Sequence, residues 1–259
     1  MKNTRKTIDD RQTKILELVR SQGKVKAEDI TKRFNISMMT VRRDLQSLEE
    51  AGLLRRVHGG AISLEKFHDA LSKEEYVSFC REKISEYAAG LLSDGDTVFV
   101  NGSLTALSSL KYTNDKRITV YTNNCHAMQI PFAPGVNIRF TGGEMRGQVM
   151  VGEYVMRNLL TLTADKTLLG CAAIYDDGEF RYDIPTEIGI NEAMISRTSK
   201  DLYILADHTK IMSRVSRENI YGSCVYDRPL TLITDDQVSS SIIEHLKQLG
   251  MRIIQVSTK

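Results

Sequence analysis

The sequence predicts an α/β protein of two parts: an N-terminal winged helix-turn-helix domain and a larger domain built on a mainly parallel sheet. Three observations support this prediction. The chain has 259 residues, which is long for one compact domain. Residues 1–66 hold 15 lysines and arginines against 9 acidic residues, whereas residues 67–259 hold 20 against 24. Strand-like and helix-like patterns alternate after residue 97. The basic part is expected to bind a polyanion.

The composition excludes several classes of protein. With 41% hydrophobic residues, 26% charged residues and only 4 prolines, the chain can bury a sizeable core and has no disordered majority. No run approaches the roughly 18 apolar residues of a bilayer span, and residues 1–10 are polar, so we expect a cytoplasmic protein without a membrane partner. The widely spaced cysteines are expected to be buried thiols: Cys80, Cys125, Cys171 and Cys224.

Residues 1–62 are predicted to form three helices and a hairpin. Apolar residues at helical spacing, such as Ile15, Ile30 and Leu45, mark helices over 10–23, 27–34 and 38–51. Ser37 is expected to cap the third helix, because its hydroxyl can accept a hydrogen bond from a backbone N–H that has no partner within the helix. Residues 53–62 are predicted to form two strands joined by a Gly-Gly turn, and this hairpin is the wing.

The exposed N-terminal end of the third helix is the predicted DNA-reading element. In a helix-turn-helix, the last helix enters the major groove with its first residues at the base edges. The wing adds cations for the phosphate backbone or the adjacent minor groove. A winged helix that binds protein instead of DNA is the alternative. The candidate DNA-binding residues are Ser37, Met38, Met39, Thr40, Arg42, Arg43, Arg55, Arg56 and His58.

Two motifs in this part are dense and specific. The turn Ile36-Ser37 leads into Thr40-Val41-Arg42-Arg43-Asp44-Leu45, and the wing reads Gly52-Leu53-Leu54-Arg55-Arg56-Val57-His58-Gly59-Gly60-Ala61. Both resemble the signature of the DeoR family of bacterial transcriptional regulators. The resemblance implies double-stranded operator DNA as a partner. Asp44 is expected to face back into the domain, where it would hold an arginine, and which arginine reads bases stays open.

The chain beyond the wing is predicted to form the α/β domain. Residues 63–72 are the expected linker, and Ser72-Lys73-Glu74-Glu75 is a capping box that opens a helix. Helical patterns alternate with strand-like runs, which is typical of a mainly parallel sheet covered by helices. These runs are residues 97–100, 118–121, 136–140, 166–169, 202–205, 230–234 and 252–256. Ligands of such sheets bind outside the carboxyl ends of the strands.

The loops after these strands carry groups suited to a phosphorylated polyol. Asn101-Gly102-Ser103 leads from a strand into a helix and offers N–H groups to an anion, although a plain tight turn is the more frequent meaning of such a triplet. Three further loops add amides, hydroxyls and cations: Thr122-Asn123-Asn124, Thr141-Gly142-Gly143-Glu144 with Arg146, and Asp207-His208-Thr209-Lys210. Lys210 or Arg146 would hold the phosphate.

The resemblance to the DeoR family continues through this part, in the loops just named, in Asp165-Lys166-Thr167-Leu168-Leu169-Gly170 and at Glu187. The family's sensor domain is similar to the ribose-5-phosphate isomerase and glucosamine-6-phosphate deaminase folds. The resemblance implies a sugar-phosphate effector and a homo-oligomer, a dimer or tetramer, formed through this domain. The effector-binding candidates are Asn101, Gly102, Ser103, Thr122, Asn123, Asn124, Gly142, Gly143, Arg146, Glu187, Asp207 and Lys210.

Two departures from the family pattern change the expected effector site. Asn101 replaces the aspartate of the first loop, and Leu104 stands where the family has a hydroxyl residue. Asn191-Glu192 replaces a basic pair that follows the glutamate in the family. One cation fewer would line that wall of the site. Either the effector is less anionic than a typical sugar phosphate, or the response is weak.

Two other functions remain as alternatives. A sugar-phosphate isomerase would use Glu187 and Asp207 as base and polar partner, and a constitutive DNA-binding protein would carry a silent sensor. A fused DNA-binding module favours a regulator, which needs only different affinities in two states. Neither metal nor other cofactor is expected from the histidine and cysteine spacing. We therefore expect a repressor of a carbohydrate-metabolism operon and not an enzyme, with domains over 1–62 and 73–259.

Overall fold

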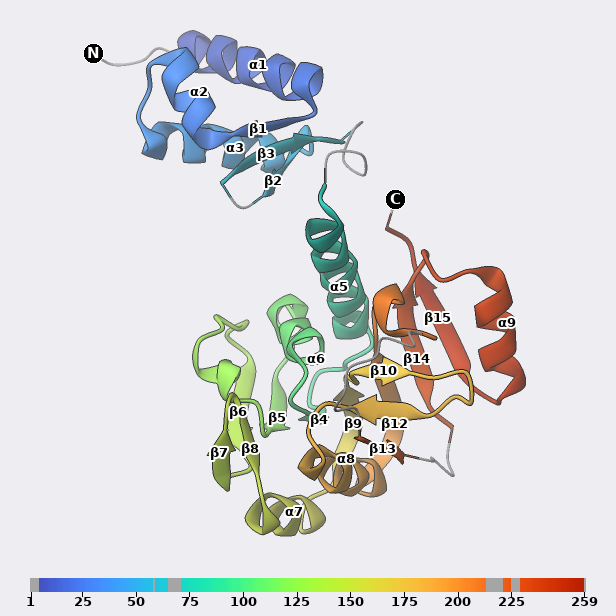
Figure 1. Ribbon diagram of the computed structural model, residues 1–259. Helices are drawn as coiled ribbons and strands as arrows, with labels where there is room; N and C mark the ends of the chain where they lie inside the picture. Colours follow the sequence, from blue (N-terminus) through green and yellow to red (C-terminus); the bar gives the residue numbers. More distant parts are fainter. Residues whose placement is uncertain (1–4, 58, 65–70, 213–220, 225–228, 259) are drawn as a thin grey trace. The chain divides into compact units, whose positions relative to one another are not determined.

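The computed structural model describes residues 5–57, 59–64, 71–212, 221–224 and 229–258 (Figure 1). The chain divides into two compact units, Met1–Tyr76 and Val77–Lys259. Residues 65–70, within the expected linker, lie outside the described part of the chain. None of the described helices is long and apolar enough to cross a membrane.

The first unit is a winged helix-turn-helix. Its helices are α1 (Arg5–Gln22), α2 (Ala27–Phe34) and α3 (Met38–Glu50). Its antiparallel sheet has the order β1 (Lys24–Lys26), β3 (Gly60–Ser63) and β2 (Leu54–Val57). Strands β2 and β3 are the predicted wing hairpin. The sequence did not indicate β1, because three residues are too few to show an alternating pattern.

The apolar stripes of the three helices meet in one core. Ile15 of α1, Ile30 of α2 and Val41 of α3 are fully buried, and Leu54 of the wing is 2% exposed. Strand β3 approaches β1 so closely that a Cβ on Gly60 would lie 2.1 Å from a backbone oxygen of β1. A glycine is therefore required there for the sheet to close on the core.

Asp44 fixes helix α3 against helix α1. Its side chain is buried, and its two oxygens accept hydrogen bonds from Arg11 Nε at 2.6 Å and Arg11 Nη2 at 2.8 Å. Gln12 Nε2 donates a third bond at 3.2 Å. A guanidinium that grips a carboxylate at two points sets orientation as well as distance. The expectation that Asp44 faces inward and holds an arginine is confirmed.

The second unit is built on a parallel sheet of seven strands. The order across the sheet is β15 (Arg252–Val256), β14 (Thr231–Asp235), β12 (Thr198–Leu205), β9 (Ala164–Leu169), β4 (Thr97–Val100), β5 (Ile118–Thr122) and β6 (Val136–Phe140). Every strand pairing within this sheet is parallel. These strands correspond to the seven strand-like runs of the sequence, and the predicted fold class is confirmed.

Helices cover both faces of this sheet. They are α5 (Lys73–Gly90), α6 (Leu104–Ser108), α7 (Glu153–Leu160), α8 (Thr186–Ser196) and α9 (Ser240–Gln248) (Figure 1). Successive side chains of a strand point to opposite faces. Accordingly, Val98 and Val100 of β4 pack in a core with residues of α5 and α6, whereas Phe99 between them packs in a core with residues of α7, α8 and α9. The unit is therefore a three-layer α/β structure.

Several short elements were not indicated by the sequence. They are the hairpin β7 (Glu144–Arg146) and β8 (Val149–Val151), and the small antiparallel sheet β10 (Ala173–Ile174), β11 (Phe180–Tyr182) and β13 (Tyr221–Cys224). Between β5 and β6 the described chain forms a 3-10 turn over Cys125–Met128 and not a longer helix. Pro131 follows this segment, and the residue before a proline is disfavoured in helical geometry.

We expect Asp44→Ala to destabilise the first unit by about 3 kcal/mol, because the Arg11 guanidinium would be left part-buried without its carboxylate. The measurement is hydrogen exchange of the α1 and α3 backbone amides in the full-length protein. Glu50→Ala, at an exposed position of the same helix, is the matched control and should change stability by less than about 0.5 kcal/mol. Equal protection in the two variants would contradict the role given to Asp44.

Candidate functional site

The N-terminal end of α3 is capped and exposed. Ser37 Oγ accepts a hydrogen bond from the backbone N–H of Thr40 at 3.2 Å and lies 2.9 Å from Thr40 Oγ1, which confirms Ser37 as the N-cap. Met39 is 67% exposed, whereas Met38 is half-buried and packs against the core of the unit. The cap therefore fixes the positions of Ser37, Met39 and Thr40 at the start of this helix.

Two guanidinium groups on this end of α3 are available to a partner. Arg42 and Arg43 are both exposed, and among the described residues neither forms a hydrogen bond or an ion pair. The neighbouring carboxylate of Asp44 is held by Arg11 and does not neutralise them. Arginine N–H groups in this state can bind phosphate oxygens or the acceptor edge of guanine. The geometry suits a helix that lies in a major groove.

The wing places two more predicted residues beside α3. On β2, Arg55 is half-buried and Arg56 is exposed. The backbone N–H of Arg56 donates to Glu49 Oε1 of α3 at 2.7 Å, so the wing strand is attached to the same helix. His58, the remaining predicted wing residue, lies outside the described residues.

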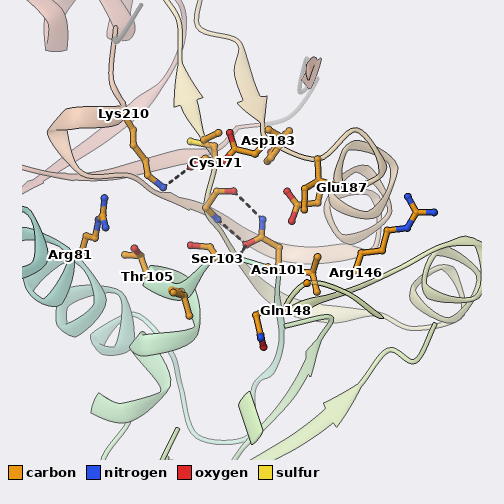
Figure 2. Close-up of a pocket in the computed structure, with 18 residues that line it drawn as sticks. Arg81, Asn101, Ser103, Thr105, Arg146, Gln148, Cys171, Asp183, Glu187 and Lys210 are labelled. Carbon is orange, nitrogen blue, oxygen red and sulfur yellow. Dashed lines mark hydrogen bonds between the residues drawn. The ribbon is translucent and has the colours of Figure 1, made fainter. Parts of the chain in front are cut away.

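A cavity of about 490 Å³ opens in the second unit at the carboxyl ends of β4 and β9 (Figure 2). From β4 the chain continues to β5 and β6 on one side of the sheet, whereas from β9 it continues to β12, β14 and β15 on the other. The loops diverge at this reversal of strand order, which is where ligands bind in open α/β sheets. The volume is typical of a small-molecule site.

Asn101 forms the floor of this cavity. It is 3% exposed, and its Nδ2 donates to the carbonyl oxygen of Gly170 at 3.0 Å and to Asn191 Oδ1 at 3.1 Å. Its Oδ1 accepts from the backbone N–H groups of Gly170 at 3.0 Å and Ser103 at 3.2 Å. All four hydrogen-bonding positions of the amide are used. Asn101 therefore ties the loops after β4 and β9 together and has no group left for an effector.

The two departures from the family pattern contact each other here. Asn101 and Asn191 lie 90 positions apart in the sequence, yet their side-chain amides are hydrogen-bonded. The two positions at which the chain departs from the family pattern are thus in contact, and they place a pair of neutral amides at the floor of the cavity.

Positive charge gathers at one side of the cavity, at Arg81 and Lys210 (Figure 2). Lys210 Nζ donates to the carbonyl oxygen of Cys171 at 2.7 Å. Arg81 Nε, from helix α5, donates to Asp207 Oδ2 at 2.7 Å. Burial raises the pKa of Asp207, but hydrogen bonds from Thr209 and Arg81 outweigh burial and hold this pKa below its usual range. Asp207 therefore stays ionised and positions the arginine.

Carboxyl groups occupy the opposite side of the cavity. Burial, helped by the charge of Asp183 and opposed by Lys210, raises the pKa of Glu187 from 4.5 to about 7. Near neutral pH the Glu187 carboxyl can thus donate or accept a hydrogen bond. Arg146, from the β7–β8 hairpin, lies on this side with a largely exposed side chain (Figure 2).

The structure brings six of the twelve predicted effector residues to the cavity: Asn101, Gly102, Ser103, Arg146, Glu187 and Lys210. The loop Thr122-Asn123-Asn124 is buried and does not line it; Asn124 Nδ2 instead donates to the carbonyl oxygen of Gly102 at 3.0 Å and supports that loop from behind. Gly142 and Gly143 are exposed and also lie off the cavity. Asp207 does not line the cavity; it accepts a hydrogen bond from Arg81, which does.

Sequence reasoning missed several residues that line the cavity. Arg81 lies in a helix, Gln148 in the turn of the β7–β8 hairpin, and Asp183 just after β11. Apart from Glu187, the sequence placed its candidates in loops that follow strands of the main sheet. The capping box at Ser72 did place a helix before the first strand, but nothing in its pattern marked position 81 as a cavity residue.

One group of described residues could hold a metal ion, although the sequence spacing gave no sign of it. The ligand atoms of Cys80, His208 and Asp235 lie within 4.8 Å of one another. His208 Nδ1 is 3.0 Å from both oxygens of Asp235, which also accept the backbone N–H groups of His208 and Gln237. Protein hydrogen bonds thus already engage the histidine and the aspartate, and they hold the loop that carries Lys210.

The thiol that lines the cavity is not a nucleophile. Cys80, Cys125 and Cys171 are buried and form no disulfide among the described residues, and the side chain of Cys224 lies outside the described part. Burial raises the pKa of Cys171, which lines the cavity, to about 12, so this thiol stays neutral and unreactive. The cations on one side and the hydrogen-bonding groups around the rest suit a polar anionic small molecule.

Models of two known domains match the chain. The DeoR-like helix-turn-helix domain matches residues 11–67. The DeoR C-terminal sensor domain matches residues 80–236, which is more than half of the chain.

Curated relatives resemble both units. The transcriptional repressor AccR of Agrobacterium fabrum is 34% identical over 78% of this chain and 81% of its own length. The lactose phosphotransferase system repressor of Staphylococcus aureus is 30% identical over 92% of this chain and 96% of its own length. The HTH-type transcriptional regulator GolR of Listeria innocua is 27% identical over 94% of this chain and 97% of its own length.

Solved structures with a similar fold are more distant. Ribose 5-phosphate isomerase A of Methanocaldococcus jannaschii has a TM-score of 0.39 and 10% identity, covering 54% of this chain and 57% of the isomerase. The translation initiation factor eIF-2B of Pyrococcus horikoshii has a TM-score of 0.40 and 13% identity, covering 83% and 70%. Scores this low transfer nothing about function.

The family assignment rests on the two domain models and the curated relatives, which agree with the capped α3 helix and the sensor-type cavity. These relatives are named as transcriptional repressors or regulators and not as enzymes. The chain therefore belongs to the DeoR family of DNA-binding transcriptional regulators and is not an enzyme.

Proposed function

We propose that this protein represses a carbohydrate-metabolism operon in the cytoplasm and leaves its operator when a phosphorylated sugar binds in the cavity. The observation that carries the proposal is the joining of two elements in one chain. One is the capped end of α3, where the guanidinium groups of Arg42 and Arg43 have no partner among the described residues. The other is a cavity with Arg81 and Lys210 on one side and Glu187 on the other. The relatives named as lactose phosphotransferase system repressors support a role in sugar use.

The operator would be read by α3. Its N-terminal residues would lie at the base edges of the major groove, where Arg42 or Arg43 can donate two hydrogen bonds to guanine. The wing residues Arg55, Arg56 and His58 would contact the phosphate backbone or the minor groove. Asp44 supports this reading, because it sets the orientation of the helix without neutralising the two arginines.

The cavity would hold the effector through charge and hydroxyl contacts. Lys210 and Arg81 offer cations to a phosphate, and Ser103, Gln148 and Glu187 offer hydrogen bonds to sugar hydroxyls. The neutral Asn101–Asn191 pair below them adds no further charge. Release from DNA requires only that the effector binds the DNA-free conformation more tightly than the bound one.

A homo-oligomer, either a dimer or a tetramer, would place two or more α3 helices on repeated half-sites of the operator. Strand β6 is an edge strand of the seven-stranded sheet. Large apolar side chains are exposed on it, on the β7–β8 hairpin and on α7: Phe140, Met145, Tyr154, Met156 and Leu160. An exposed apolar surface beside a strand edge favours contact with a second copy of the chain.

We expect Arg42→Ala and Arg43→Ala each to weaken operator binding about 10- to 100-fold at moderate salt, since one good arginine contact to a base is worth roughly 1–3 kcal/mol. Fluorescence anisotropy with a DNA fragment from upstream of the protein's own gene measures this. Arg20→Ala removes an exposed arginine from α1 and is the matched control. Unchanged binding in both α3 variants, or an equal loss in the control, would show that α3 is not the reading helix.

Lys210→Ala should abolish effector-induced release of the operator, because the cavity loses a cation that no carboxylate neutralises by direct contact. The effector is first found by a thermal-shift screen of sugar phosphates, polyol phosphates and free sugars, since a ligand of the folded state raises Tm. For each protein, the operator affinity with effector is then compared with its operator affinity without effector. Unaltered release in the variant would place the phosphate elsewhere, and no response to the whole panel would favour a silent sensor.

Glu187→Gln should remove a pH dependence of stability. The folded chain holds a proton on Glu187 that the unfolded chain releases above pH 4.5, so this stabilisation is present below pH 4.5 and is lost as pH rises through about 7. Glutamine stays neutral throughout. The Tm of the variant relative to the unsubstituted protein should therefore increase by roughly 3–8 °C between pH 5 and pH 8. If the Tm values of the two proteins ran parallel over this pH range, the raised pKa of Glu187 would be contradicted.

A further inference from the structure

We propose that Arg81 binds the anionic group of the effector, and that helix α5, which carries Arg81, transmits occupancy of the cavity to the DNA-binding unit. The inference rests on the proposed function and assigns a group to its ligand: a phosphate ester or an oxyanion of the same shape and charge. It adds a residue of α5, Arg81, which was not among the candidates predicted from the sequence.

Arg81 is held in place by one edge of its guanidinium. Nε donates to the buried carboxylate of Asp207, while the side chain as a whole is 45% exposed. Among the described residues, Nη1 and Nη2 have no partner. A guanidinium fixed in this way presents a rigid pair of donors to an anion and loses little conformational freedom on binding. The arginine is therefore prepared for a ligand.

The surroundings of Arg81 favour a doubly charged group. Lys210 lies on the same side of the cavity, and its ammonium group donates to a backbone carbonyl and not to a carboxylate (Figure 2). Thr105 also lines this part of the cavity, and its hydroxyl has no partner among the described residues. Two cations and a hydroxyl match the charge and acceptor oxygens of a phosphate ester. A neutral sugar would leave the Lys210 ammonium group without an anion in direct contact among the described residues.

Helix α5 is attached to the cavity by two consecutive turns. Arg81 reaches Asp207 in the loop after β12, and Ser85, one turn later, donates to the carbonyl oxygen of Thr105 at 2.8 Å. Cys80, the neighbour of Arg81, is fully buried near His208 and Asp235. An anion bound at Nη1 and Nη2 of Arg81 therefore acts on a helix that is packed against the same loops.

The other end of α5 belongs to the DNA-binding unit. The helix runs unbroken from Lys73 to Gly90, and the division between the two units falls inside it, after Tyr76. In its first turn, Glu75 closes the capping box with Ser72 and binds Lys24 Nζ at 2.6 and 2.7 Å. Lys24 pairs with Ile62 of β3, which belongs to the wing. The box confirms the predicted helix start.

These contacts make α5 a physical connection between ligand and DNA. Six residues separate Glu75 from Arg81, which is roughly 9 Å along a helix axis. A helix is stiff over this length, so a displacement of the turn that holds Arg81 is carried to the turn that holds Glu75 and, through Lys24, to the wing sheet. The anion of the effector, rather than its sugar ring, is the group that the DNA-binding unit responds to.

The first test uses inorganic phosphate as the probe and full-length protein at constant ionic strength. We expect phosphate to raise the Tm of the unsubstituted protein, Arg81→Gln to weaken this phosphate affinity about 10- to 100-fold, and Arg81→Lys to give an intermediate loss. Arg81→Lys keeps a cation beside Asp207, so it remains informative if Arg81→Gln fails to fold. No phosphate-dependent rise in the unsubstituted protein, or an unchanged affinity in Arg81→Lys, would overturn the subsite.

A matched control lies in a neighbouring cavity. Arg81 and Thr105 also border a second cavity of about 350 Å³ beside α5 and α6, which Lys111 lines. Lys111→Gln removes the same unit of charge from that cavity alone. It should respond to phosphate as the unsubstituted protein does. If Lys111→Gln lost the phosphate response and Arg81→Lys kept it, the anion would bind in the second cavity and the proposal would be wrong.

The second test follows α5 itself. Hydrogen exchange of residues 73–84 should change when phosphate is added to the unsubstituted protein and should not change in Arg81→Lys. Exchange that changes only in the loops at residues 101–105 and 207–210 would refute transmission through α5. The proposed function is judged separately, by preference for the upstream DNA over random DNA. A protein that binds phosphate through Arg81 without this preference would retain the subsite and lose the repressor assignment.

Discussion

The ion pair between Arg81 and Asp207 is the contact on which the sensor account depends. Asp207 is buried and ionised, and its hydrogen bonds with Thr209 already hold the start of the loop that carries Lys210. Through Arg81 the same carboxylate holds helix α5. A single buried charge thus sets the position of both cations of the cavity. A buried carboxylate that lost its partner would carry a large energetic cost, so the arrangement has few alternatives in the absence of ligand.

The sheet topology explains why the cavity lies where it does. Strands β4 and β9 are adjacent and parallel, but the chain leaves them in opposite directions. The loops that follow must diverge, and Asn101 joins them at the bottom by bonds to Gly170. The hydrogen bond between Asn101 and Asn191 extends this joint to helix α8 without adding charge. The positive charges of Arg81 and Lys210 lie on α5 and in the loop after β12, whereas Asn101 at the floor of the cavity is neutral.

Much of the fold could be predicted from the sequence because its signals are local. Strands buried on both faces are apolar runs, and all seven were visible, as were the α3 cap at Ser37 and the capping box at Ser72. Strands of two or three residues, such as β1 and β10, show no period and were missed. The role of Asp44 was also accessible, because an acidic residue on the buried face of a helix requires a cationic partner.

The site was only partly predictable, for a different physical reason. Loop residues such as Ser103 and Lys210 follow strands, and the parallel-sheet rule brings them to one edge. Arg81 reaches the cavity from a helix, and Asn191 meets Asn101 across 90 positions, so neither contact follows from local spacing. The loop Thr122-Asn123-Asn124 also follows a strand, but it is buried and does not line the cavity. Its asparagine side chains donate hydrogen bonds to backbone carbonyl groups of neighbouring segments.

The most direct measurement of the central claim compares two dissociation constants for the full-length protein at about 150 mM salt. One is for a duplex from upstream of its own gene, and the other is for a duplex of random sequence with the same length. The account predicts that the upstream duplex binds at least about 1,000-fold more tightly, as specific regulators do. Equal affinities for the two duplexes would contradict it.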